Sequence, residues 1–207
     1  MVKSVLVQDY FDSYCYFFID EATKHGFLID PGAEPEKLLE IIRQEGWVIE
    51  KILLTHGHID HIGAVSVIRA ELNLPVYAHP ETLSFIMDEE VNLSDVYGEP
   101  PDIGEVLPLS DGGVFQLEAD PSFRLKTIFT PGHTVDSVVF YAEREQVAFV
   151  GDSIYKGCLG DYLYPGGNYE LLLRTVKRKI LALPEETVLY SGHSEPTTVG
   201  DEKPLYA

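Results

Sequence analysis

The sequence has only two cysteines, Cys15 and Cys158, which lie far apart in a chain of 207 residues. This spacing indicates neither a disulfide framework nor a thiolate metal site. We interpret both as small apolar side chains in a reducing compartment. The first nine residues lack the pattern of a secretion signal, and no stretch approaches the roughly 18 apolar residues of a membrane span. These absences predict a cytoplasmic protein.

Basic residues are also scarce. The chain has 15 Lys and Arg against 34 Asp and Glu, a formal net charge of -19. Such a surface repels nucleic acid phosphates and anionic lipid head groups. We therefore expect a small-molecule substrate as the partner, and neither nucleic acid nor membrane.

The composition is that of an ordinary globular chain, with 45% hydrophobic and 24% charged residues. This length suits one domain with a sizeable core, so we predict a single domain over residues 1–207.

Apolar and β-branched runs bounded by turn residues predict strands, and apolar stripes predict helices. The predicted strands cover residues 4–7, 13–20, 26–29, 51–54, 123–130, 137–142, 146–150 and 187–190. The predicted helices cover residues 34–45, 64–72 and 169–183, the last with Asn168 as N-cap and a buried stripe of Leu172, Val176, Ile180 and Leu183. Residues 92–113 and 155–167 are expected to be irregular. Many strands with a few helices indicate an α/β protein with sheets inside and helices outside.

The string His56-Gly57-His58-Ile59-Asp60-His61 carries the strongest chemical signal. In a continuous helix His56 and His58 would point about 200° apart, so both face one ion only if the segment is a turn or an extended loop. Gly57 and Gly63 favour a loop. His61 then lies near the start of the next helix, where the helix dipole keeps its ring neutral enough to bind a metal.

Three further candidates, His133, Asp152 and His193, each follow an apolar strand and a glycine. A glycine lets the backbone turn at a strand end, so these side chains can point into a shared cleft with the motif. Five histidines and two aspartates suit zinc, iron or manganese, and they are too many for one tetrahedral ion. The simplest interpretation is a pair of ions that share a carboxylate.

This pattern resembles the signature of the metallo-β-lactamase superfamily, and its order and spacing look like the glyoxalase II branch, the hydroxyacylglutathione hydrolases. The segments Thr130-Pro131-Gly132-His133-Thr134 and Gly151-Asp152 are close to that branch. The resemblance implies a four-layer αβ/βα sandwich. It also implies a ligand assignment: His56, His58 and His133 for the first metal, Asp60, His61 and His193 for the second, and Asp152 as the bridge.

A metal pair predicts a hydrolase in which a bridging hydroxide attacks a carbonyl group. A thioester such as S-2-hydroxyacylglutathione suits this chemistry, because a thiol of pKa about 8.5 leaves readily. Besides binding metal, Asp60 is a candidate catalytic residue that orients the water. Zinc is the first choice for the two divalent ions, with iron or manganese as alternatives.

The substrate side of the resemblance is incomplete. Where the family has Arg or Lys just after a glycine, this chain has Gly160-Asp161, and an acid there would repel the carboxylates of glutathione. The sequence also ends soon after His193, without the helical extension of the longer family members. Candidate substrate contacts are Tyr155, Lys156, Tyr162 and Tyr164; alternatively they are a solvated lysine and packing aromatics.

Other functions remain open. A persulfide dioxygenase would use one iron held by two histidines and an aspartate, whereas a lactonase would open a cyclic ester with the same hydroxide. A non-catalytic metal-binding protein would have no open coordination position. True β-lactamases of the superfamily usually carry a secretion signal, and its nucleases carry extra domains. The metal, the acyl and thiol parts of the substrate and the oligomeric state are left open by the sequence.

Overall fold

Strands from the first half of the chain form one six-stranded sheet. The computed structural model describes residues 1–9, 11–94 and 102–206. The strand order of this sheet follows the sequence: β1 (Val2–Gln8), β2 (Asp12–Ile19), β3 (His25–Ile29), β4 (Val48–Leu53), β5 (Val76–Ala78) and β6 (Leu107–Pro108). The first three strands are antiparallel, and β3 to β6 are parallel.

Strands from the second half of the chain form a second six-stranded sheet. Its order is β14 (Thr197–Thr198), β13 (Val188–Ser191), β10 (Val147–Gly151), β9 (Val138–Ala142), β8 (Arg124–Phe129) and β7 (Val114–Gln116). Only β10 and β13 pair in parallel; the other neighbours are antiparallel. The short strands β11 (Ile154–Tyr155) and β12 (Cys158–Leu159) form a separate hairpin.

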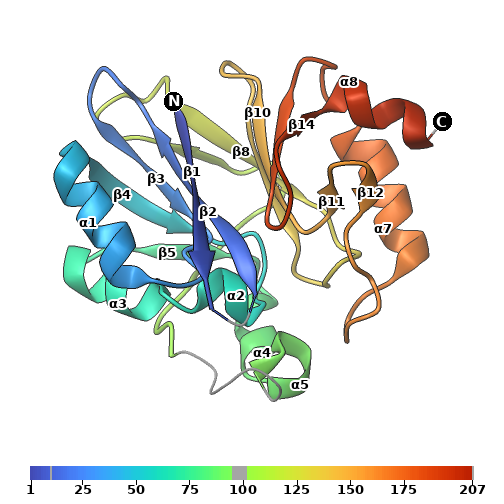
Figure 1. The fold of residues 1–207 in the computed structure, drawn as a ribbon, viewed down its shortest axis with the longest axis horizontal. Helices are drawn as coiled ribbons and strands as arrows, with labels where there is room; N and C mark the ends of the chain where they lie inside the picture. Colours follow the sequence, from blue (N-terminus) through green and yellow to red (C-terminus); the bar gives the residue numbers. More distant parts are fainter. Residues whose placement is uncertain (10, 95–101, 207) are drawn as a thin grey trace.

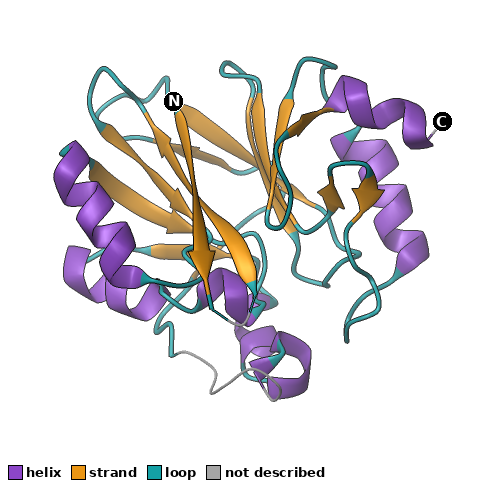
Figure 2. Ribbon diagram, viewed as in Figure 1, coloured by secondary structure: helices purple, strands orange, loops and turns teal. Residues whose placement is uncertain are grey.

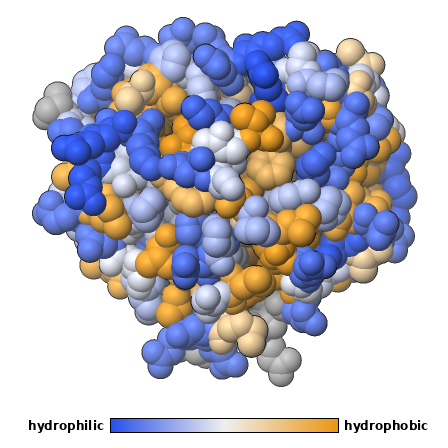
Figure 3. All heavy atoms as spheres, turned by 180° about the vertical axis from the view of Figure 1, so that it is seen from behind, coloured by the Kyte–Doolittle hydropathy of each residue, from blue (hydrophilic) through white to orange (hydrophobic). Residues whose placement is uncertain are grey.

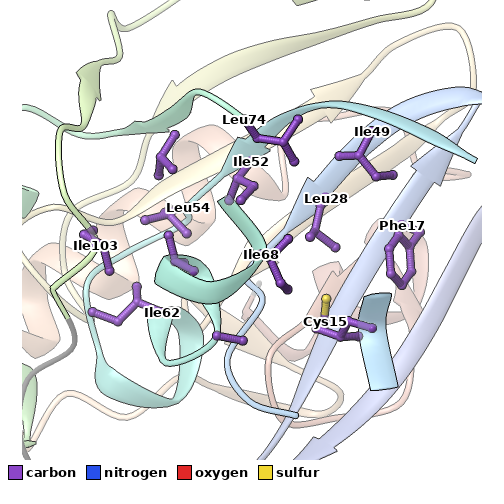
Figure 4. Packing of buried hydrophobic residues seen from close by; sticks show 14 of the residues in the cluster. Cys15, Phe17, Leu28, Ile49, Ile52, Leu54, Ile62, Ile68, Leu74 and Ile103 are labelled. Atoms are coloured by element: carbon purple, nitrogen blue, oxygen red, sulfur yellow. The ribbon is translucent and has the colours of Figure 1, made fainter. Parts of the chain in front are cut away.

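The two sheets face each other, and helices cover their outer faces (Figures 1 and 2). Helices α1 (Pro35–Glu45) and α3 (Val65–Leu72) pack on the first sheet, on the apolar cluster seen in Figure 4. Helix α7 (Tyr169–Thr175) and the π-helical turn Val176–Ile180 pack on the second sheet. A third cluster, which includes Phe18 and Phe149, fills the space between the sheets. These layers are the predicted four-layer αβ/βα sandwich.

The described residues include four further short helices. They are α2 (Ile59–Ile62), α4 (Thr82–Ile86), α5 (Glu89–Asn92) and α8 (Val199–Glu202), the last followed by a 3-10 turn at Lys203–Tyr206. Within the described parts of the chain, no helix is both long and apolar enough to cross a membrane. On the face shown in Figure 3, hydrophobic residues lie in patches among hydrophilic ones.

Several predicted elements need correction. The predicted helix 169–183 changes to a π-helical turn at Val176, where Leu181 N donates to Val176 O. This wider turn buries Leu181, so Leu183 is only half-buried and the predicted stripe ends early. The hairpin β11–β12 lies in the expected loop 155–167, and β6 lies in the expected irregular stretch 92–113, of which residues 95–101 are outside the description.

The two cysteines differ. Cys15 is fully buried in the core, as expected, whereas Cys158 is exposed. The apolar interpretation of Cys158 was wrong, because β12 belongs to a two-stranded hairpin outside the main sheets.

Candidate metal centre

The histidine motif lies immediately after β4, at the end of that strand. Thr55 is held there by two contacts to the Asp30 carboxylate, which accepts from Thr55 N at 2.8 Å and from Thr55 Oγ1 at 2.5 Å. Residues 56–58 are non-helical, as predicted, and His58 has an extended backbone. His61 lies in the single-turn helix α2, ahead of the longer α3.

The structure brings all seven predicted donors together, in two groups. The histidine group contains His56, His58 and His133; the mixed group contains Asp60, His61 and His193. Within each group the ligand atoms lie within 4.8 Å of one another. In the histidine group, Nδ1 of His58 lies 3.0 Å from His56 Nε2 and 3.1 Å from His133 Nε2. In the mixed group, His193 Nε2 lies 3.1 Å from Asp60 Oδ2.

Asp152 lies between the two groups. Its Oδ2 is 3.1 Å from His193 Nε2 and 3.7 Å from His133 Nε2, and its Oδ1 is 3.5 Å from His61 Nε2. Asp152 also forms a third possible ligand set with His56 and His61. One carboxylate is therefore close to ring nitrogens of both groups.

Neighbouring oxygens orient four of the five imidazole rings. His61 Nδ1 donates to Asp30 Oδ2 at 2.9 Å, and His193 Nδ1 donates to the carbonyl of Asp12 at 2.8 Å. His133 Nδ1 donates to the carbonyl of Asp161, and His56 Nδ1 lies 3.1 Å from Thr55 Oγ1. A hydrogen bond at Nδ1 leaves Nε2 of the same ring as the free donor toward a metal.

Asp30 belongs to this site, although the sequence pattern did not single it out. It is 3% exposed and contacts both Thr55 and His61. A charged residue directly after the apolar strand β3 was the available signal, because a buried carboxylate needs partners. The following Gly32 is required by close approach, since a Cβ there would lie 1.7 Å from Asp60 O.

Glycine is also required beside the mixed group. A Cβ at Gly192 would lie 2.2 Å from Asp152 Oδ1 and 2.6 Å from His61 Cε1. The glycine before His193 therefore makes room for two proposed ligands as well as turning the chain.

Burial and nearby charges shift the pKa values of the histidines in opposite directions. Burial, with the nearby His61 and His58, holds the pKa of His56 well below its usual value, and burial with His133 lowers the pKa of His58 to about 3. For His193, burial opposes protonation, but Asp152 and Asp60 outweigh it and raise its pKa to about 10. His56 and His58 thus prefer neutral rings, whereas the carboxylates of Asp152 and Asp60 attract positive charge to His193.

The site has the character of a metal centre. Three polar atoms that face it are buried and form no hydrogen bond: Asp60 Oδ2, His61 Nε2 and Asp152 Oδ1. Such atoms are costly to bury unpaired, and a bound cation would satisfy all three while leaving the neutral imidazoles as ligands. Imidazole and carboxylate donors suit zinc, iron and manganese.

A cavity of about 220 Å³ opens onto this centre. Two of the predicted substrate contacts, Tyr155 and Tyr164, line it. The other two do not: Lys156 is exposed, and Tyr162 packs on Tyr169 with ring centroids 5.0 Å apart. The remaining lining consists of Phe11, His58, Asp60, Leu93, His133, Asp152, Asp161 and His193.

The two remaining histidines, His79 and His25, do not belong to the seven donors. His79 Nδ1 accepts from Glu81 N at 3.1 Å, just ahead of α4. His25 lies in β3, where its Nδ1 is 2.8 Å from Glu50 Oε1.

The sequence profile of the metallo-beta-lactamase superfamily matches residues 9–193, which include all seven donors. This chain belongs to the metallo-β-lactamase superfamily. Members of this superfamily bind divalent metals, and membership supports a metal-dependent hydrolase.

Three relatives illustrate its place in the superfamily. Hydroxyacylglutathione hydrolase GloC of Haemophilus influenzae is 30% identical over 197 residues, which cover 93% of this chain and 91% of that protein. The crystal structure of the BLEG-1 B3 metallo-beta-lactamase has a TM-score of 0.90 and 32% identity, and covers 99% of this chain and 97% of its own. The structure of TTHA1623 in a di-iron-bound form has a TM-score of 0.82 and 34% identity, with 97% and 96% covered.

Proposed function

We propose that this metallo-β-lactamase superfamily protein is a binuclear metal-dependent hydrolase of thioesters, in the glyoxalase II-like branch. The observation that carries the proposal is the position of Asp152, within 3.7 Å of ring nitrogens in both the histidine group and the mixed group. A carboxylate between two ligand sets is the arrangement expected for two ions held side by side.

The ligand assignment follows the two groups. His56, His58 and His133 would hold one ion; Asp60, His61 and His193 would hold the other; Asp152 would bridge them. Zinc is our first choice, with iron or manganese as alternatives, since TTHA1623 binds two irons. Such ions, when bound, lower the pKa of a water ligand and polarise a carbonyl oxygen.

The chain's own residues supply orientation. Asp60 Oδ2 lies 3.1 Å from His193 Nε2 and lines the cavity, so Asp60 is placed to accept a proton from a water in the site. Tyr155 stands at the cavity wall beside Asp152 and His193, with its ring centroid 5.9 Å from that of His193. A thiolate leaving group needs no protonation, so the proposed reaction needs no general acid.

Metal analysis together with a substrate panel tests this proposal. We expect about two ions per chain by plasma mass spectrometry and hydrolysis of a lactoyl thioester that stops on chelation. One iron per chain with oxygen consumption on a persulfide would replace the hydrolase with a dioxygenase. Preferred hydrolysis of a lactone or a β-lactam would redirect the substrate class, and a metal-loaded protein inactive on all of these would indicate a non-catalytic role.

A further inference from the structure

The wall of the cavity is apolar, aromatic and acidic. Beyond the proposed metal ligands it consists of Phe11, Leu93, Tyr155, Tyr164 and Asp161. Among the described residues that line it, none is Lys or Arg, and the sequence has neither residue at positions 10, 95–101 or 207. The wall therefore offers no cation to pair with an anionic substrate.

Asp161 is held in this wall from both sides. Its Oδ1 accepts from Leu163 N at 2.7 Å, and its carbonyl accepts from His133 Nδ1. It lies in the segment between β12 and α7 (Figure 1). Asp161 therefore lines the cavity and contacts a proposed metal ligand through its backbone, so its negative charge lies close to the cavity.

The basic residue nearest to Asp161 in the sequence, Lys156, does not line the cavity. Lys156 is exposed and lies outside the cavity lining, while its backbone N donates to Ser194 Oγ at 2.9 Å. The net charge of -19 adds a repulsive field for anions approaching from solution.

The cavity is also small. Its 220 Å³ is below the roughly 300–1,000 Å³ typical of sites that enclose a drug-sized ligand. The acyl group can enter, but a large thiol part must extend past the mouth, beside Asp161 and the aromatic rings. Aromatic rings accept neutral groups and favour cations.

We infer that the substrate is a thioester whose thiol part is neutral or cationic, and that Asp161 selects against thiols bearing carboxylates such as glutathione. This inference rests on the proposed thioesterase function and names its substrate class.

Three lactoyl thioesters that share one acyl group test the inference: those of glutathione, N-acetylcysteamine and thiocholine. We expect kcat/KM to rise in that order, with glutathione at least about fivefold below thiocholine at low ionic strength. The gap should narrow between roughly 10 mM and roughly 500 mM salt, because salt screens the repulsion. A glutathione thioester that is the best of the three would overturn the inference.

Variants locate the effect. Asp161→Asn keeps an oxygen acceptor for Leu163 N, so we expect a rise of about threefold in kcat/KM for the glutathione thioester, and a larger rise for Asp161→Lys. Asp120→Asn is the matched control. Asp120 Oδ1 also accepts from a backbone N–H two residues on, that of Ser122, but Asp120 lies just before β8 and outside the cavity lining. An equal change of kcat/KM for the glutathione thioester in Asp161→Asn and Asp120→Asn would contradict the inference. A loss of turnover of that thioester alone in Lys156→Gln would also contradict it.

Binding separates this inference from the proposed function. The matching thioethers of the three thiols have no scissile bond, and calorimetry on the metal-loaded protein gives their order of affinity without turnover. The same order in a protein that hydrolyses none of the thioesters would refute the thioesterase but uphold the charge preference. Tightest binding of the glutathione thioether would refute the preference whether or not the protein is a thioesterase.

Discussion

Single residues decide whether the two donor groups act as one site, and Asp152 is the residue that joins them. It follows β10 and Gly151, whose φ of 50° turns the chain toward the centre. Because a Cβ at Gly151 would lie 2.5 Å from Thr55 Oγ1, the turn also packs against the end of β4. Two strands of different sheets are thus brought into contact beside the carboxylate.

Asp152→Ala should lose metal and activity together. The variant removes the carboxylate that lies between the two groups and leaves His61 and His193 without it. We expect metal content well below that of the unmodified protein and an activity loss of at least about 100-fold. Full metal occupancy with full turnover would contradict the bridging role.

Asp30→Asn should weaken metal binding without removing any proposed ligand. Asn keeps an acceptor but no charge, so the hold on His61 Nδ1 and on Thr55 weakens. We expect about 10-fold to 100-fold lower affinity in a competition with a chromogenic chelator. Asp20→Asn is the control, because Asp20 caps an exposed turn through Ala22 N and Thr23 N. Equal affinities for the two variants would refute the orienting role.

The proposed ligands lie at the ends of secondary-structure elements. The sequence patterns predicted some of these elements and missed others. The predicted helix 34–45 is confirmed as helix α1, which ends at Gly46, a glycine with a φ of 67°. The three-residue strand β7 was missed, since its pairing with β8 depends on partners that a local apolar pattern does not reveal. The π-helical turn after α7 was missed for the same reason, because the second sheet selects which side chains are buried.

Contacts between elements also predict a pH dependence of stability. Glu50 of β4 is half-buried, which disfavours its charge, but backbone N–H groups of Glu118 and Ala119 and the His25 ring outweigh this and lower its pKa. Its contribution is therefore complete above the unfolded value of about 4.5 and is lost as the pH falls through the lower folded pKa.

We expect Glu50→Gln to reduce the free energy of unfolding by about 1–2 kcal/mol at pH 7, and by less below pH 4. Urea titrations at several pH values measure this. Glu45→Gln, which changes an exposed pair with Lys3, should have a smaller effect. A Glu50 difference that is constant from pH 7 to pH 3 would refute the ionic contribution.

For the whole molecule, bound metal ions would act as counter-ions in a strongly acidic protein. Several carboxylates converge on the centre of a chain with a net charge of -19, so bound cations should favour the folded state. A ligand that binds only the folded state at 100 times its Kd contributes about 2.7 kcal/mol.

Chelation should therefore lower the melting temperature by about 5–10 °C, and added zinc should restore it. Scanning calorimetry with and without chelator measures the shift, and Asp152→Ala should respond much less. A melting temperature that is indifferent to chelator in the unmodified protein would mean that the ions contribute nothing to folding.

The identity of the donors could be inferred from local sequence, because His56 to His61 lie within six positions and His133, Asp152 and His193 each follow a strand and a glycine. Local patterns suffice there, since strand ends gather at one edge of a sheet. The oxygens that orient the rings were decided by the fold alone: Asp30 reaches His61, Asp12 reaches His193 and Asp161 reaches His133. These contacts join residues 28 to 181 positions apart. The pairing of β3 with β4 brings Asp30 to His61, and the packing of the two sheets brings Asp12 to His193.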